Sequence, residues 1–369
     1  MPITAEEFTR QLDGAHARLL NQRETRRNRF FRDGLLGNGE IEIASETFHP
    51  ADILAAMAAE TCRIARAESD GKYSEETAET VLLHYPSPIA LAFNAFRYGS
   101  KQPLARLGFM RDTWEAAVSV VLAFLFSECA ARNCKIFEVL MRDGPTNNPR
   151  PIRSVDLFSE KVATRLGCIE GILLYARVTN TPLVAAELIP VEIIGEMRRL
   201  NDIRNGFSHE QTKSEKQAEE IIDECEPDLL DILADLDGLQ QVRFYRLHGI
   251  SRRSANTLEV EPLAGHAIAR RVYDIPVHNA AVALCAALAL PGDLDPTCVQ
   301  CRDDLFLASP YLYCANDNSG HQTRILLLKR IRLAEAKATY EVSGYSTTRD
   351  VDLTRVQPEI DRVKLLMQP

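Results

Sequence analysis

The stretch from Ile89 to about Leu239 has the apolar spacing of α-helices almost throughout, and it constrains the fold more than any other feature of the chain. Apolar residues recur there at three- and four-residue intervals, which places them on one face of a helix. The candidate helices are Ile89–Tyr98, Leu104–Asn133, Val155–Val178, Pro190–Glu210 and Glu215–Leu236. Ser214 and Gln217 have capping-box spacing at the start of the last of them. The sequence therefore predicts a helical bundle with four long helices, over residues 86–240.

Different patterns flank this bundle. Residues 1–85 form an α-rich N-terminal region, with helical spacing over Ala5–Phe31 and Pro50–Ala67, and the two prolines of His84–Pro88 break the chain after it. Beyond Gln240 the spacing changes to that of strands. The strand candidates are Val242–Leu247, Thr257–Val260, Leu305–Tyr313, Arg324–Ile331 and Ala338–Val342, and the helix candidates there are Asn279–Leu290 and Gln357–Met367. The predicted fold class is mainly α, with an α+β C-terminal domain over residues 241–369.

Composition limits the classes of function. The chain has 369 residues, 46% of them apolar, which is enough for two or three domains with cores of their own. Its formal net charge is -9, so any contact with RNA must come from local basic patches. The start of the chain lacks the pattern of a signal peptide, and the apolar run Ala116–Phe126 is too short to span a bilayer. Nine scattered cysteines are typical of reduced thiols. We therefore expect a cytoplasmic protein that does not contact a membrane.

The string Arg204-Asn205-Gly206-Phe207-Ser208-His209 carries the clearest chemistry. It lies at the end of a predicted helix and places a fixed cation and an imidazole about one and a half turns apart. Arg204 falls within the apolar stripe of that helix, where an unpaired guanidinium is costly, so it must meet a carboxylate, a phosphate or a groove open to water. Asn205 and His209 lie one turn apart on the neighbouring face. An Arg beside a His can hold a phosphate and move a proton without a metal, which suits phosphodiester cleavage.

An Arg, a polar residue, three further residues and a His, late in a helical bundle, resembles the HEPN superfamily. The resemblance covers roughly residues 86–240 and implies a metal-independent endoribonuclease of bacterial anti-phage defence or a toxin, with Arg204, Asn205 and His209 as the catalytic residues. It also implies a homodimer in which two copies of the motif face each other across one groove. Family members that a nucleotidyltransferase antitoxin inactivates carry a Tyr two residues after the His. This chain has Gln211 there, which argues against that mode of control.

The predicted mechanism follows from these side chains. His209 takes the proton of a ribose 2'-hydroxyl, which attacks the adjacent phosphorus and leaves a 2',3'-cyclic phosphate. Arg204 neutralises the charge that develops on the phosphate oxygens, and Asn205 orients the His or binds the phosphate. The substrate is then RNA, and no cofactor or metal is required. The C-terminal domain is the expected site for a regulatory protein or ligand.

Several alternatives stay open. The bundle could be a non-catalytic HEPN-like module for dimerisation or binding, a hypothesis that the acidic net charge favours. Glu115 or Glu128, which interrupt an apolar helix, could pair with Arg204. Zinc could be held by Cys298, Cys301, Cys314 and His321. The basic cluster Arg23–Arg32 could contact an RNA backbone or form a solvated helix face.

Overall fold

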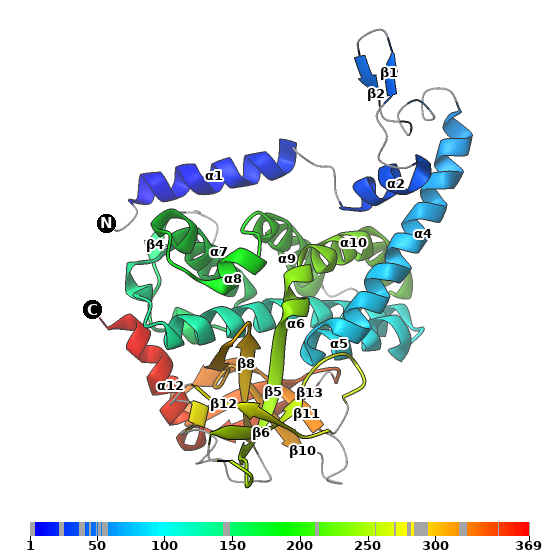
Figure 1. The fold of residues 1–369 in the computed structure, drawn as a ribbon. Helices are drawn as coiled ribbons and strands as arrows, with labels where there is room; N and C mark the ends of the chain where they lie inside the picture. The colour runs from blue at the N-terminus through cyan, green and yellow to red at the C-terminus, as the bar shows by residue number, and fades with distance from the viewer. Residues whose placement is uncertain are drawn as a thin grey trace.

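The computed structural model is a layer of helices packed on an antiparallel sheet (Figure 1). It describes residues 4–21, 26–36, 41–43, 46–48, 50, 53, 58–142, 148–210, 214–254, 256–268, 271–278, 282–283, 294–316, 323–345 and 347–368. The helices are α1 (Ala5–Asn21), α2 (Arg26–Leu36), α4 (Ala59–His84), α5 (Ser87–Asn94), α6 (Pro103–Ala131), α7 (Val162–Thr179), α8 (Val184–Leu188), α9 (Ile193–Glu210), α10 (Glu215–Asp235) and α12 (Gln357–Lys364).

Nine strands of the described chain form one sheet in the order β13-β12-β11-β10-β8-β5-β6-β7, with β9 also paired to β8. Every strand pair in it is antiparallel. Its strands are β5 (Val242–Ile250), β6 (Thr257–Pro262), β7 (Tyr273–Pro276), β8 (Asp295–Cys301), β9 (Asp304–Leu307), β10 (Leu312–Asn316), β11 (Thr323–Arg332), β12 (Lys337–Val342) and β13 (Thr347–Asp352). Two short hairpins, β1 (Ile41–Ile43) with β2 (Glu46–Phe48) and β3 (Leu140–Met141) with β4 (Arg150–Pro151), are separate from it.

Helix α6 lies at the centre of the molecule and contacts α5, α7 and α10 as well as strands β9 and β11. Its apolar residues lie on all sides of the helix, as expected of a helix that is buried on most of its surface. Trp114, Val118, Phe124 and Phe126 are among its buried residues. By length and composition α6 could also cross a membrane, but 83% of its most apolar 18-residue window is buried inside the protein. The burial of α6 in the core therefore accounts for its composition.

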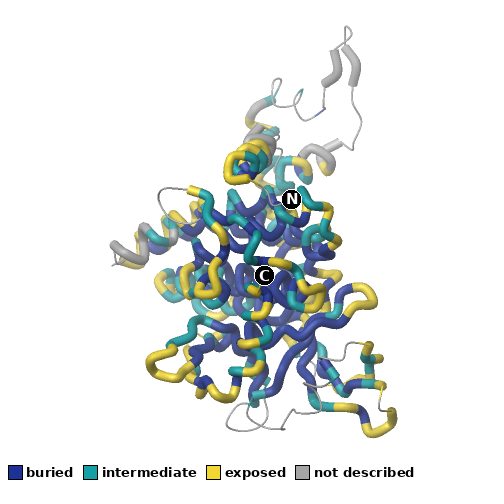
Figure 2. Tube along the Cα trace, turned by 90° about the vertical axis from the view of Figure 1, so that its left-hand side faces the viewer, coloured by how far each residue is buried: buried dark blue, intermediate teal, exposed yellow. Residues whose placement is uncertain are grey.

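The helices and the sheet share one hydrophobic core. Residues of α6, α7 and α10 cluster with Val299, Phe306 and Ile325 of the sheet, and Figure 2 shows buried chain running from the helices into the strands. A smaller cluster on β5, β6, β8 and β9, which includes Leu247 and Val260, covers the opposite face. The predicted mainly α fold with a HEPN-like bundle is therefore wrong, because the helices pack against a nine-stranded sheet and the chain is α+β.

The local predictions differ from the structure mainly in the sheet. Strands β7, β8 and β13 were not predicted, and the single strand expected at Leu305–Tyr313 is two strands, β9 and β10. Since β8 is buried almost throughout, it shows none of the alternation that marks a half-buried strand. Within the second helix expected at residues 50–67, residues 50 and 53 are helical, and α4 begins at Ala59 and continues to His84. The helix expected at 279–290 lies outside the described residues, apart from 282 and 283.

A buried charge network joins four strands of the sheet, β5, β6, β8 and β11. The Arg246 guanidinium, on β5, donates to Asp295 at 2.8 Å and contacts Glu261 at 3.3 Å. His248 lies 3.1 Å from the same Glu261 carboxylate, and Thr323 donates to it at 3.0 Å. Burial raises the pKa of Glu261, but His248, Arg246 and Thr323 more than offset this, so its pKa is lowered from the usual 4.5. The ionised carboxylate of Glu261 is therefore the form that the fold favours.

The lowered pKa of Glu261 makes part of the stability depend on pH. A carboxyl group whose pKa is depressed by folding stabilises the protein above its unfolded pKa, and this contribution is lost as the pH falls through the folded pKa. We expect the difference in unfolding temperature between the wild type and Glu261→Gln to be largest at neutral pH and to shrink below about pH 4.5. Thermal unfolding of both proteins from neutral to acidic pH measures it. A difference in unfolding temperature that stays constant, or that grows as the pH falls, would contradict the lowered pKa of Glu261.

Candidate functional site

Helix α9 carries the predicted motif over its last two turns. The backbone is helical through Arg204, Asn205 and His209, as predicted, so Asn205 and His209 lie on one face at i, i+4 spacing. The side chains of Arg204 and His209 lie outside the described residues. The Asn205 side chain is half-buried and lines the large cavity described below.

The apolar stripe and two ion pairs hold α9 in place. Ile193, Met197 and Leu200 are buried, in agreement with the predicted stripe. Arg198 donates to the buried Glu170 of α7 at 2.7 Å, and Arg199 pairs with Asp228 of α10. The motif therefore lies on a helix that is fixed between two neighbours.

Glu128 was one expected partner of Arg204, but its contacts lie elsewhere. Its carboxylate is fully buried and accepts from the backbone N–H groups of Val184 at 2.8 Å and Ala185 at 2.9 Å. Arg132 donates to it at 2.8 Å. The two carboxylate oxygens thus accept hydrogen bonds from the start of α8 and from Arg132 at the end of α6. The second expected partner, Glu115, lines the same cavity as Asn205.

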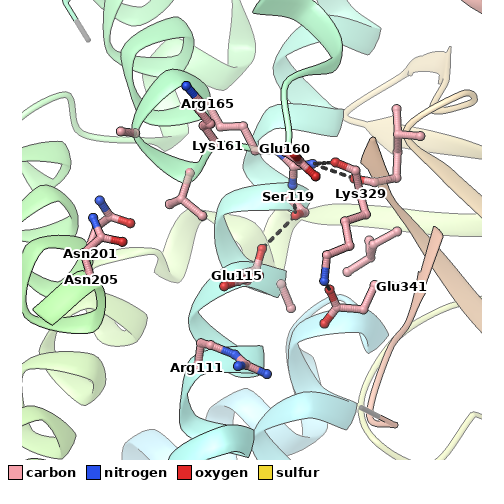
Figure 3. A pocket seen from close by; sticks show the side chains of 15 residues that line it. Arg111, Glu115, Ser119, Glu160, Lys161, Arg165, Asn201, Asn205, Lys329 and Glu341 are labelled. Carbon is pink, nitrogen blue, oxygen red and sulfur yellow. Dashed lines mark hydrogen bonds and ion pairs between the residues drawn. The ribbon is translucent and has the colours of Figure 1, made fainter. Parts of the chain in front are cut away.

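The cavity has a volume of about 560 Å³ and lies between α6, α7, α9 and the strands β11 and β12. Figure 3 shows Asn201 and Asn205 on one side and the sheet residues Lys329 and Glu341 on the other. The polar lining residues are Arg111, Glu115, Ser119, Glu160, Lys161, Arg165, Asn201, Asn205, Lys329 and Glu341. The lining thus includes four cations and three carboxylates, groups that bind charged or polar ligands.

Arg165 of α7 is the most unusual of these residues, because it is a buried cation bonded to neutral groups. Its guanidinium donates to the hydroxyl of Ser119 at 2.8 Å and to the carbonyls of Ser159, Leu328 and Lys329 at 2.7–2.9 Å. The two strand carbonyls flank a bulge in β11. Burial lowers the pKa of Arg165, an effect that the charges of Glu115 and Glu341 oppose.

Most of the other charges that line the cavity are paired. Lys329 lies 3.3 Å from Glu341, Arg111 lies 2.8 Å from Asp112, and Glu160 lies 3.1 Å from Arg330. Burial raises the pKa of Glu341, Lys329 opposes this, and the negative charges of Glu115 and Asp112 add to it. The pairs of Lys329 and Arg330 involve β11, whereas Arg111 pairs with its neighbour within α6.

The zinc hypothesis fails on geometry. Cys298 and Cys301 are three residues apart on β8, so they point to opposite faces of the sheet. Cys298 packs in the smaller apolar cluster and Cys301 in the core beneath the helices. They cannot hold one ion together. His321 lies outside the described residues, and the part of the chain that is described contains no group of three potential metal ligands.

The basic cluster near residue 30 has a structural role at two of its positions. Arg26 lies 2.7 Å from Asp235 and 3.0 Å from Asp237, and Arg27 lies 3.8 Å from Asp231. These pairs tie α2 to the end of α10. Arg26 and Arg27 therefore do not form the free basic surface that an RNA contact would require.

Sequence patterns identified the motif but missed the residues around it. Asn201 lies four residues before Asn205, so its spacing alone could have placed it on the same face. Arg165 and Lys161 carry no such signal, because the folded chain brings α7 to the cavity. Comparisons with protein-family models, with curated proteins and with solved structures find no match. The resemblance to HEPN proteins therefore rests on the motif alone.

Proposed function

We propose that this chain is a metal-independent endoribonuclease in which Arg204, Asn205 and His209 cleave RNA. The observation that carries the proposal is that Asn205, the middle residue of the motif, lines a cavity with Lys161 and Arg165, two cations that pair with no carboxylate in the part of the chain that is described. Phosphate groups bind cations and amide donors of this kind. The cavity thus offers an RNA strand a place to lie beside the motif, despite the acidic balance of the whole chain.

The proposed chemistry uses side chains only. His209 accepts the proton of the 2'-hydroxyl, the 2'-oxygen forms a bond to phosphorus, and the bond from phosphorus to the 5'-oxygen breaks. The 5'-oxygen takes a proton from water, so the products are a 2',3'-cyclic phosphate and a 5'-hydroxyl end. Arg204 neutralises the charge on the phosphate oxygens. His209 lies in the last turn of α9, where the helix dipole favours the imidazolium that forms.

The setting that we propose comes from the resemblance of the motif. The protein acts in the cytoplasm as a homodimer, as an effector of bacterial anti-phage defence or as a toxin. Residues 241–369 receive a regulatory protein or ligand. In a dimer with facing motifs, both sides of the scissile bond would meet protein groups.

The test is cleavage of total RNA by the purified chain in the presence of EDTA. We expect cleavage to persist in EDTA, to leave 2',3'-cyclic phosphates, and to fall by about a hundredfold or more in His209→Ala, the scale of a general base. His278→Ala is the control, because His278 is exposed and lies two residues after the end of β7. It should cleave like the wild type.

Three outcomes would overturn the proposal. Loss of cleavage in EDTA, or products with a 5'-phosphate, would indicate a different mechanism. A wild-type chain that is inert toward RNA would favour the second candidate, a non-catalytic binding module. Asn201 favours that candidate, since its buried Oδ1 atom has no hydrogen-bond partner in the described structure and a ligand donor would satisfy it.

A further inference from the structure

The wall of the cavity formed by α7 begins with an uncapped helix end. The first N–H groups of a helix have no acceptor within it, and the helix dipole makes this end positive. Lys161 is the N-cap residue of α7, and an ammonium group cannot accept a hydrogen bond. Val162 and Ala163, which follow it, also line the cavity. The start of this 18-residue helix therefore presents donors and positive charge to the cavity.

Arg165, one turn further along α7, adds a donor at the same wall. A guanidinium has five N–H groups, and four of those of Arg165 are bonded to Ser119, Ser159, Leu328 and Lys329. The fifth, on Nη1, has no acceptor among the described residues, and no described carboxylate lies within ion-pair distance of Arg165. The residue is 8% exposed, so its charge is poorly solvated. An anion in the cavity would satisfy both the donor and the charge.

Asn201, in contrast to Arg165, has a hydrogen-bond acceptor that no described group satisfies, so it would bind a donor group of a ligand. It is 4% exposed, and its Oδ1 atom is buried with no hydrogen-bond partner in the described structure. Figure 3 shows the side chains of Asn201 and Asn205 directed from α9 toward the other lining residues. A buried acceptor without a donor is destabilising, and native structures seldom leave one unsatisfied. A hydroxyl or amino group of a ligand would supply that donor.

We propose that the cavity binds a nucleotide unit. The phosphate lies at the start of α7 with Lys161 and Arg165, and a hydroxyl or amino group of the same unit donates to Asn201. A volume of about 560 Å³ lies within the usual range of small-molecule sites, which is roughly 300–1,000 Å³. The unit has two sources, a free mononucleotide or one residue of an RNA strand, and the second rests on the function proposed above.

Calorimetric titration of the full-length His209→Ala chain in EDTA tests this proposal. The probes are adenosine 5'-monophosphate, adenosine and the tetranucleotide of adenosine. We expect the monophosphate to bind at least about tenfold more tightly than adenosine, because only the monophosphate meets the α7 end. Lys161→Ala should weaken this binding about tenfold. Lys101→Ala is the matched control, an exposed lysine just before the start of α6, and should leave binding unchanged.

Asn201→Leu separates a ligand contact from a structural one. If Asn201 binds the ligand directly, Asn201→Leu should weaken monophosphate binding about tenfold. The unfolding temperature should stay equal or rise. A large loss of unfolding temperature, or equal binding of adenosine and its monophosphate, would overturn the proposal. So would equal binding by the Lys161→Ala and Lys101→Ala chains.

The tetranucleotide arm identifies the source of the unit. Tighter binding of the tetranucleotide, weakened by Lys161→Ala, indicates a residue of a strand, whereas equal binding indicates a free mononucleotide. A wild-type chain that binds the monophosphate but never cuts RNA overturns the proposed function alone. A chain that cuts RNA but binds neither phosphorylated probe through Lys161 overturns the nucleotide site alone.

Discussion

Replacing Arg246 with Met is expected to lower the free energy of unfolding by about 3–5 kcal/mol, the cost of breaking one side of a buried ion pair. Arg246 is 5% exposed and meets two buried carboxylates, Asp295 and Glu261. Methionine keeps most of the volume of the side chain, but it removes the cation beside Asp295 and one of the two basic neighbours of Glu261, the other being His248. Urea unfolding of the variant and the wild type measures the difference.

The same strand supplies the control. Arg243, also on β5, is exposed, and Arg243→Met should change the free energy of unfolding by no more than about 0.5 kcal/mol. Adding Asp295→Asn to Arg246→Met removes one of the two carboxylates that contacted Arg246. The double variant should therefore regain part of the lost free energy of unfolding. If Arg246→Met were as stable as Arg243→Met, the network would not stabilise the sheet.

Gly171→Ala is expected to destabilise the protein by about 3 kcal/mol, the upper end of the usual cost of overpacking. A Cβ atom at Gly171 of α7 would lie 2.2 Å from the carbonyl oxygen of Leu140 in β3, and a backbone atom cannot move aside as a flexible side chain can. Gly167, one turn earlier, meets the carbonyl of Arg142 in the same way at 2.5 Å. The two glycines let the β3 hairpin lie directly on α7.

Gly108→Ala in α6 is the matched substitution with the opposite sign. A Cβ atom there meets nothing within 4 Å, so alanine should stabilise the helix by about 0.5–1 kcal/mol through its better helix propensity. Thermal unfolding of the two variants compares one chemical change in two settings. Equal effects at both positions would contradict the close approach of β3 to α7.

The candidate site was predictable to the extent that it depends on one helix. The helical spacing of residues 190–210 places Asn205 and His209 on one face, and α9 spans Ile193–Glu210. The cavity beside Asn205 was not predictable, because its walls come from α6, α7, α9 and the sheet. Arg165 reads in the sequence as one more helical arginine. Its burial follows from its position in the folded chain, where it donates to the carbonyls of Leu328 and Lys329 at the bulge of β11.

The sequence by itself determined the local elements whose signals lie within a few residues of each other. The periodicity of α6, α9 and α10 predicted their bounds to within about three residues, and Ser214 accepts from the N–H of Gln217 as its spacing predicted. Alternation likewise located β5, β6, β11 and β12.

The tertiary structure alone decided the fold class, the order of the strands in the sheet and the contacts between distant residues. Strand β8 pairs with β5, which precedes it by about fifty residues, and with β10, and its buried residues show no alternation to reveal this. Burial on both faces of a central strand removes the local signal, so its assignment depends on long-range pairing. The same packing gave Glu128 its place at the start of α8 and separated Cys298 from Cys301 across the sheet. Local periodicity indicates which face of a segment is buried in the core. The elements that pack against that face depend on the fold of the whole chain.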